Sequence, residues 1–212
     1  MSLLGRAVDL YGYVFHPSTV IGLGVLLLIH YEWAGQSADR SLLWKRWGAF
    51  VGAGVLGFVP TLAFFALQRG TLSKAFSGSS WQLDMMVASG VVLGAAITWG
   101  VWRRYDWGRL VPGGMAALIA VVPPYAALSP FWDISGHVIF ALAPTLYLAL
   151  LDRKFLPLLA IPVVMVPTRV LVNAHSALES VAGFVVAAAI VVAVYLWRSP
   201  GSEREATAAT AP

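Results

Sequence analysis

The chain has 212 residues, of which 59% are hydrophobic and 11% are charged, with a formal net charge of +4. Soluble domains carry roughly a quarter charged residues, so this composition excludes an ordinary water-soluble protein and indicates a membrane protein. The sequence has no cysteine, which excludes disulfides and thiolate chemistry.

Seven apolar blocks follow one another along the chain, each near the roughly 20 residues that a helix needs to cross the hydrocarbon layer. They are 17–34, 47–68, 85–102, 110–128, 135–151, 155–171 and 177–197. This pattern predicts an all-α, polytopic membrane helical bundle with seven transmembrane helices, a six-helix core plus one being the alternative. Residues 1–198 are predicted to form one transmembrane domain, beginning with a short amphipathic surface helix, and 199–212 a disordered cytoplasmic tail.

The basic residues of the loops support seven spans, because positive charge is retained on the cytoplasmic side of a membrane. One set of alternate connections carries ten Lys and Arg residues and the other set carries four. This alternation predicts an outer N-terminus and a cytoplasmic C-terminus. It also explains the net charge, so nucleic acid is not needed as a partner. A signal peptide cleaved near Ala34 is disfavoured, because it would leave the basic residues of 40–46 outside.

Proline and glycine predict local features of three spans. Pro123 and Pro124 predict a bend in the fourth span, and Pro162 and Pro167 predict a bend in the sixth. The glycine-rich stretch 48–57 predicts a face for close helix packing.

The stretch "FWDISGH", residues 131–137, gathers polar residues directly before an apolar run. Ser135 is a preferred helix N-cap, and the free backbone N–H groups of the following turn form an anion site. Gly136 would let a ligand approach the backbone, and His137 would point toward that ligand from the first turn. In the predicted topology this corner faces outward.

A second polar cluster, "PTRVLVNAHSALES", occupies residues 167–180 across the next predicted hairpin. Arg169 stands near the outer end of the sixth span, and its planar fork suits phosphate oxygens. His175 and Glu179 are four residues apart, which stacks them on one side of a helix. A carboxylate that accepts one ring proton leaves the other nitrogen free to attack. These residues predict phosphoryl transfer through a histidine nucleophile.

The segment 135–183 resembles the core of the type 2 phosphatidic acid phosphatase superfamily, whose motifs read P-S-G-H and S-R-x5-H-x3-D. The chain has I-S-G-H at 134–137 and T-R-x5-H-x3-E at 168–179. The resemblance implies a membrane lipid phosphatase that works without a metal or another cofactor on a phosphorylated lipid at the extracytoplasmic face. It implies that His175 is the nucleophile, His137 the general acid and Glu179 the orienting acid.

The same resemblance implies that Ser135, Gly136 and Arg169 cradle the phosphate. Two positions depart from the superfamily pattern, because Ile134 replaces a proline and Glu179 replaces an aspartate. The first superfamily motif, K-x6-R-P, is absent before 134, which leaves Arg69 and Lys74 as the candidates for its cations.

The D-I-S-G-H stretch is similar to the fat-storage-inducing transmembrane proteins, which adds Asp133 to the expected substrate-binding residues. That resemblance implies an alternative activity, hydrolysis of the diphosphate in acyl-coenzyme A. A catalytically silent lipid-binding or transport protein is a further alternative. Metal binding is disfavoured, because His30 falls on the opposite side from the other three histidines. No pattern indicates an oligomeric state.

Overall fold

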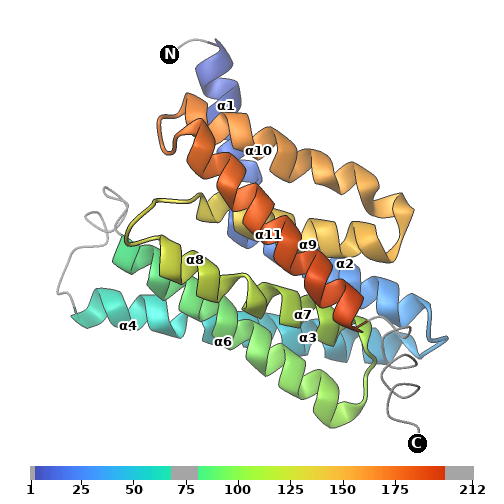
Figure 1. Ribbon diagram of the computed structural model, residues 1–212. Coiled ribbons are helices and arrows are strands. Elements are labelled where there is room, and N and C mark those ends of the chain that lie inside the picture. The colour runs from blue at the N-terminus through green and yellow to red at the C-terminus, as the bar shows by residue number, and fades with distance from the viewer. Residues whose placement is uncertain (1–2, 68–80, 199–212) are drawn as a thin grey trace, which may run out of the picture.

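The computed structural model describes residues 3–67 and 81–198, which are helical except for short connections (Figure 1). The elements are α1 (Leu3–Val14), α2 (Pro17–Ala34), α3 (Arg40–Gly57), α4 (Val59–Leu67), α6 (Trp81–Tyr105), α7 (Leu110–Ala120), α8 (Val122–Leu128), α9 (Gly136–Leu151), the 3-10 helix η1 (Arg153–Leu159), α10 (Ala160–Leu171) and α11 (Ala177–Arg198). The predicted all-α bundle is confirmed. The predicted tail, Arg69 and Lys74 lie outside the described residues.

Within residues 3–67 and 81–198, six helical segments are long and apolar enough to cross a membrane. They are Pro17–Ala34, Arg40–Leu67, Gln82–Tyr105, Leu110–Leu128, Arg153–Leu171 and Ala177–Arg198. Five of them coincide with a predicted span to within a few residues. These six segments support a multi-pass membrane protein.

The second span starts earlier than predicted, because α3 begins at Arg40 and not near Trp47. The basic residues in its first two turns indicated a loop. However, Arg46 is only 1% exposed and donates hydrogen bonds to the Gln36 side chain and the Trp107 carbonyl. Partners inside the protein therefore allow a charge to stand in a buried part of the helix.

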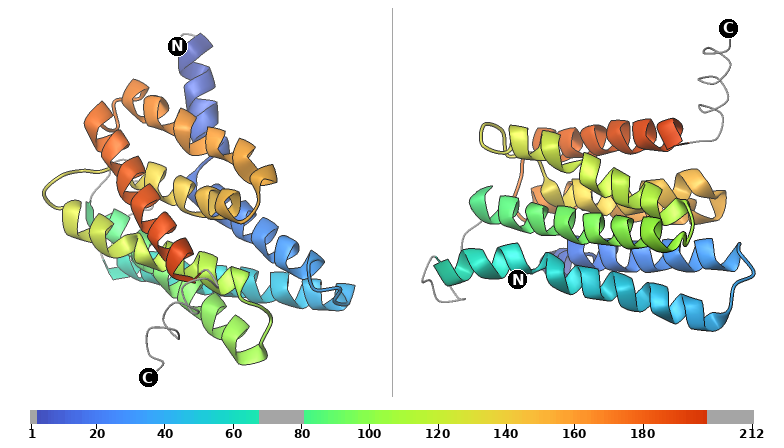
Figure 2. Two further views of the ribbon diagram at one scale, coloured as in Figure 1. Left: turned by 45° about the vertical axis from the view of Figure 1, so that its right-hand side comes forward. Right: turned by 90° about the horizontal axis from the view of Figure 1, so that it is seen from below.

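The fifth predicted span is α9, whose 16 residues reach about 24 Å, less than the roughly 30 Å hydrocarbon core. Twelve of its residues are buried, and it contacts α2, α7, α10 and α11. In Figure 2, α11 lies across this central part of the bundle, while α3 and α4 pack on α6 at the far side. A helix that is hydrophobic all round suits this central position.

α9 runs beside α2 along its whole length. The rings of His16 and His137 lie 5.5 Å apart at one end, and those of Tyr31 and Phe155 lie 5.3 Å apart beyond the other. Midway, a Cβ on Gly24 would lie 2.9 Å from the Cβ of Pro144. α9 therefore covers the depth of a helix that is long enough to span. This pairing favours a seventh crossing, which stays a prediction.

The predicted bend in the fourth span is present, because the helix is interrupted at Val121 between α7 and α8. In the sixth span the 3-10 helix η1, which contains Pro157, passes into α10 at Ala160. Pro162 stands in the first turn of α10, where a missing N–H costs little, and Pro167 lies inside the helix. The bend expected at these two prolines stays a prediction.

The glycine-rich stretch of α3 packs closely only at its end. A Cβ on Gly90 of α6 would lie 2.1 Å from the carbonyl oxygen of Gly57. At Gly48 and Gly52 an added Cβ would meet nothing within 4 Å. The predicted packing face is thus confirmed for the C-terminal part of the stretch alone.

Candidate functional site

The two sequence motifs meet at one end of the bundle, which we call the site end. His16 lies there before α2, His137 in the first turn of α9, and His175 between α10 and α11. His137 interacts electrostatically with His16, His175 and Arg169. The structure therefore brings three of the four histidines and one arginine together.

A close approach of two backbones joins the start of α9 to the start of α11. The Ser135 N–H donates to the carbonyl oxygen of Glu179 at 3.3 Å. A Cβ on Gly183 would lie 2.9 Å from the Ser135 carbonyl oxygen, so this position requires glycine. Ser135 is the N-cap of α9, but its hydroxyl makes no capping bond and is buried without a partner among the described residues.

The end of α10 carries a turn that returns the chain toward the site. Asn173 adopts a left-handed conformation with φ of 55°. Its N–H donates to Val170 at 3.0 Å, and the Ala174 N–H donates to Arg169 at 3.1 Å. These two bonds form a Schellman motif, in which asparagine tolerates the left-handed residue. The motif sets His175 beside the last turn of α10, at the same end as Arg169.

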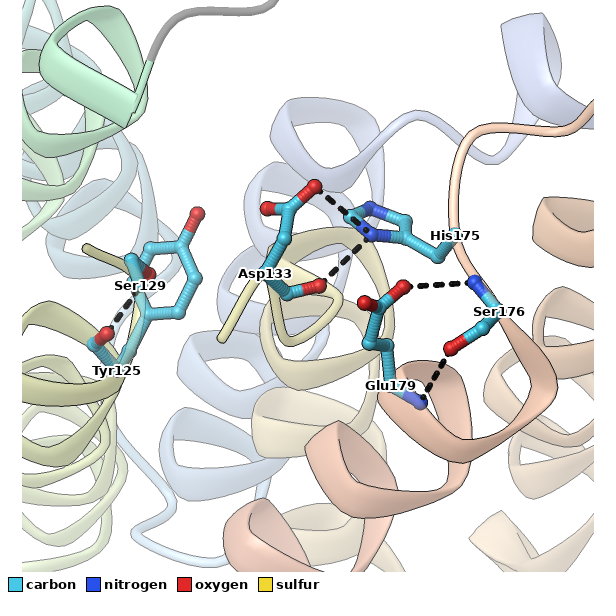
Figure 3. A network of polar contacts seen from close by, with 6 residues as sticks. All are labelled: Tyr125, Ser129, Asp133, His175, Ser176 and Glu179. Atoms are coloured by element: carbon cyan, nitrogen blue, oxygen red, sulfur yellow. Dashed lines mark hydrogen bonds and ion pairs between the residues drawn. The ribbon is translucent and has the colours of Figure 1, made fainter. Parts of the chain in front are cut away.

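The ring of His175 is held by Asp133 (Figure 3). Its Nδ1 lies 2.9 Å from the Asp133 carbonyl oxygen and 3.5 Å from the carboxylate Oδ2. A carbonyl oxygen only accepts hydrogen bonds, so Nδ1 carries the hydrogen in this contact and Nε2 keeps its lone pair. Only 11% of the His175 side chain is exposed. The contact thus fixes the tautomer in which Nε2 can act as a nucleophile.

Glu179 does not make the predicted contact with His175. His175 lies before α11, and the Glu179 carboxylate accepts the Ser176 N–H at 2.7 Å. In return, the Ser176 hydroxyl accepts the Glu179 N–H at 3.2 Å (Figure 3). This reciprocal pair is a capping box, which uses glutamate at the third helical position. The pattern S-A-L-E at 176–179 was the sequence signal for it.

Gly136 is required by packing. A Cβ at this position would lie 2.6 Å from the Tyr125 hydroxyl, and Tyr125 is only 4% exposed. The tyrosine therefore occupies the space of a side chain at 136, and the approach of a ligand to the backbone there stays a prediction.

A pocket of about 240 Å³ lies beside His137 and Arg169. It is lined by Val8, Asp9, Gly12, His137, Met165, Thr168, Arg169 and Val172. Pockets for drug-sized ligands measure about 300–1,000 Å³, so this volume suits a headgroup and not a whole lipid. The Nε atom of Arg169 is buried and has no hydrogen-bond partner within the described part of the chain. His175 is not part of the pocket wall.

Three residues of the site end were missed by the sequence interpretation. Asp9 reaches the pocket from α1, and Asp84 of α6 interacts electrostatically with Asp133, His175 and Arg169. No local pattern marks either carboxylate.

His16 is the third missed residue, and its only sequence signal is its place before the proline that opens α2. Its Nδ1 accepts the Ser18 N–H at 3.3 Å, so Nε2 carries the hydrogen. Partial burial and the charge of Arg169 lower the pKa of His16. A neutral imidazole with an N–H donor therefore lies at the site end.

In the part of the chain that the structure describes, no group of three or more His, Asp or Glu side chains could hold a metal ion. Comparison with family models, with curated proteins and with solved structures gave no match.

Proposed function

We propose that this protein hydrolyses a phosphate monoester or diphosphate of a membrane lipid through a phosphohistidine at His175. The observation that carries the proposal is the hydrogen bond from Nδ1 of His175 to the carbonyl oxygen of Asp133. It leaves Nε2 free at the end of the bundle where Arg169 and His137 also stand. These are the groups that phosphoryl transfer to an imidazole requires.

The reaction proceeds in two displacements. Nε2 of His175 forms a bond to phosphorus while the bond from phosphorus to the lipid oxygen breaks, and His137 in its imidazolium form donates a proton to that oxygen. His137 then accepts a proton from water as the water oxygen attacks phosphorus. The P–N bond breaks, which releases inorganic phosphate and restores both imidazoles. The residues of the chain perform each of these steps.

The site offers several donors for phosphate oxygens. The guanidinium of Arg169 borders the pocket, and its buried Nε lacks a partner among the described residues. The start of α9 adds the positive end of a helix dipole. His16 adds a neutral N–H donor. Together they support binding of a phosphate group at this end, which the loop charges assign to the extracytoplasmic side.

The test is release of inorganic phosphate from a panel of lipid phosphates by purified protein in lipid nanodiscs with a chelator present. We expect His175→Ala to reduce release by about 1,000-fold or more. His30→Ala is the matched control, because His30 lies at the other end beside Trp33 and should leave turnover unchanged. Equal release by wild type and His175→Ala contradicts the proposal.

The contact of Asp133 with His175 favours one second candidate, a diphosphatase of the fat-storage type acting on acyl-coenzyme A. Asp133 is the residue that carries that resemblance, and its carboxylate lies 3.5 Å from the ring. This activity would yield nucleotide fragments of coenzyme A in place of free phosphate. A lipid that copurifies without turnover of any substrate would favour a silent lipid-binding protein instead.

A further inference from the structure

α1 is anchored to the bundle by one face. It contacts α10, and Figure 1 and the left view of Figure 2 show α1 steeply inclined to that helix, with its first turns projecting past the other helices. The Tyr11 hydroxyl donates to the Ile161 carbonyl oxygen at 2.5 Å, and Val8 is 9% exposed. This inward face is therefore fixed by the protein itself.

A second face of α1 is apolar and largely exposed. At 100° per residue, Leu3, Ala7, Leu10 and Val14 fall within an arc of about 60°, which we call the apolar stripe. Leu3 is 89% exposed, Leu10 61% and Val14 45%. Between the stripe and the inward face lies a polar flank of Arg6, Asp9 and Tyr13. α1 thus exposes an apolar face whose contact with water is unfavourable.

The position of α1 relative to the spans identifies what covers the stripe. Only two residues separate its last residue, Val14, from Pro17, where the first membrane-spanning helix begins. α1 must therefore lie at the depth where a span leaves the hydrocarbon layer. An amphipathic helix at that depth places its apolar face in lipid and its basic residues near the headgroups, and Arg6 borders the stripe.

The polar flank and the inward face connect this surface to the site. Val8, Asp9 and Gly12 form part of the pocket that contains His137 and Arg169. We propose that the apolar stripe of α1 lies in the lipid–water interface, so that the bilayer surface holds one wall of this pocket in place. A second part rests on the proposed function: the substrate is an amphiphile whose tail stays in the bilayer beside α1 while its phosphate binds at the site end, where His137 and Arg169 border the pocket and His175 interacts with His137.

The first part can be tested without any assay of turnover. Because the chain has no cysteine, single cysteines at Ala7, Leu10 and Asp9 can each carry an environment-sensitive fluorophore in nanodiscs containing spin-labelled lipid. We expect strong quenching by lipid at Ala7→Cys and Leu10→Cys and weak quenching at Asp9→Cys. Equal quenching at all three positions, or stronger quenching at Asp9→Cys, overturns the placement.

The second part compares bilayer and soluble substrates. Leu10→Glu should reduce turnover of a long-chain lipid phosphate in the bilayer by about tenfold, the cost of losing one buried leucine. Turnover of a water-soluble phosphate ester should fall by a smaller factor, because that substrate needs the pocket wall but not a contact between its tail and α1. Tyr13→Glu is the matched control, because it adds the same charge on the polar flank. Equal loss with both substrates overturns this part, whereas quenching as expected with no turnover by wild type overturns the proposed function alone.

Discussion

The two ends of the bundle both bury ionisable groups, but their partners differ. At the end opposite the site, Glu32 is 4% exposed and accepts hydrogen bonds from the Trp102 indole at 2.8 Å and from the backbone of Leu110. Gly108 has a φ of 135°, and a Cβ there would lie 2.4 Å from the Glu32 carboxylate. A tight turn thus closes over this carboxylate.

Arg46 compensates the charge at the same end. It donates to the Gln36 side chain at 2.6 Å and to the Trp107 carbonyl, and it interacts electrostatically with Glu32. Its Nε and Nη1 are buried and lack hydrogen bonds to described residues. These contacts tie α2 and α3 to the turn between α6 and α7.

Both ends also bury donors that have no partner in the described ranges: Arg46 Nε and Nη1, Trp47 Nε1 and Arg198 Nε at the end opposite the site, and Arg169 Nε with the hydroxyls of Ser135 and Ser180 at the site end. A pocket borders each end, since Glu32, Gln36, Arg109 and Lys154 line one and His137 and Arg169 line the other. What differs is the set of side chains: three histidines gather with Arg169 at the site end, whereas at the opposite end a buried carboxylate and a guanidinium hydrogen-bond to neighbouring segments.

The largest effect should come from removing the buried carboxylate opposite the site. Glu32→Ala leaves the Trp102 indole and the Leu110 N–H without their acceptor and removes the charge that interacts with Arg46, which should lower the free energy of unfolding by about 3 kcal/mol. Denaturant unfolding in micelles measures this. Arg169→Ala is the control at the site end and should lose phosphate binding with little change in stability. The contrast between the ends fails if both variants are equally destabilised.

A smaller effect on stability should distinguish a structural role from a catalytic role for the capping box at the site end. Ser176→Ala removes the cap of α11 and should lower the free energy of unfolding by about 1 kcal/mol. Glu179→Gln keeps the capping box and should leave phosphate release near that of wild type. A large loss of turnover in Glu179→Gln at unchanged stability would instead show that Glu179 acts as the orienting acid.

The smallest effect concerns pH. The pKa of His16 lies below its ordinary value of 6.5, because of burial and the charge of Arg169. The unfolded chain then binds a proton at higher pH than the folded chain, so stability falls as pH drops below about 6.5. His16→Asn keeps a capping side chain and should lose less thermal stability between pH 7 and pH 5. A steeper loss in the variant would contradict this sign.

Hydropathy alone predicted the helical class and most span boundaries, because apolar length is a local property of the chain. Hydropathy wrongly predicted a loop around Arg46, because the burial of this residue depends on partners in two other segments. The roles of Asp133 and Glu179 also depended on how two hairpins dock. Asp84 belongs to this group, since only the folded chain brings α6 close to Arg169.

The left-handed turn at Asn173 limits which substitutions, insertions and deletions this segment can tolerate. Its backbone bonds join Val170 and Arg169 to the two residues that follow the helix, so the register between Arg169 and His175 is set by hydrogen bonds and not by side-chain identity. Glycine at 173 would preserve that register, whereas a β-branched residue would oppose it. Inserting or deleting one residue there would displace the imidazole from Asp133 altogether.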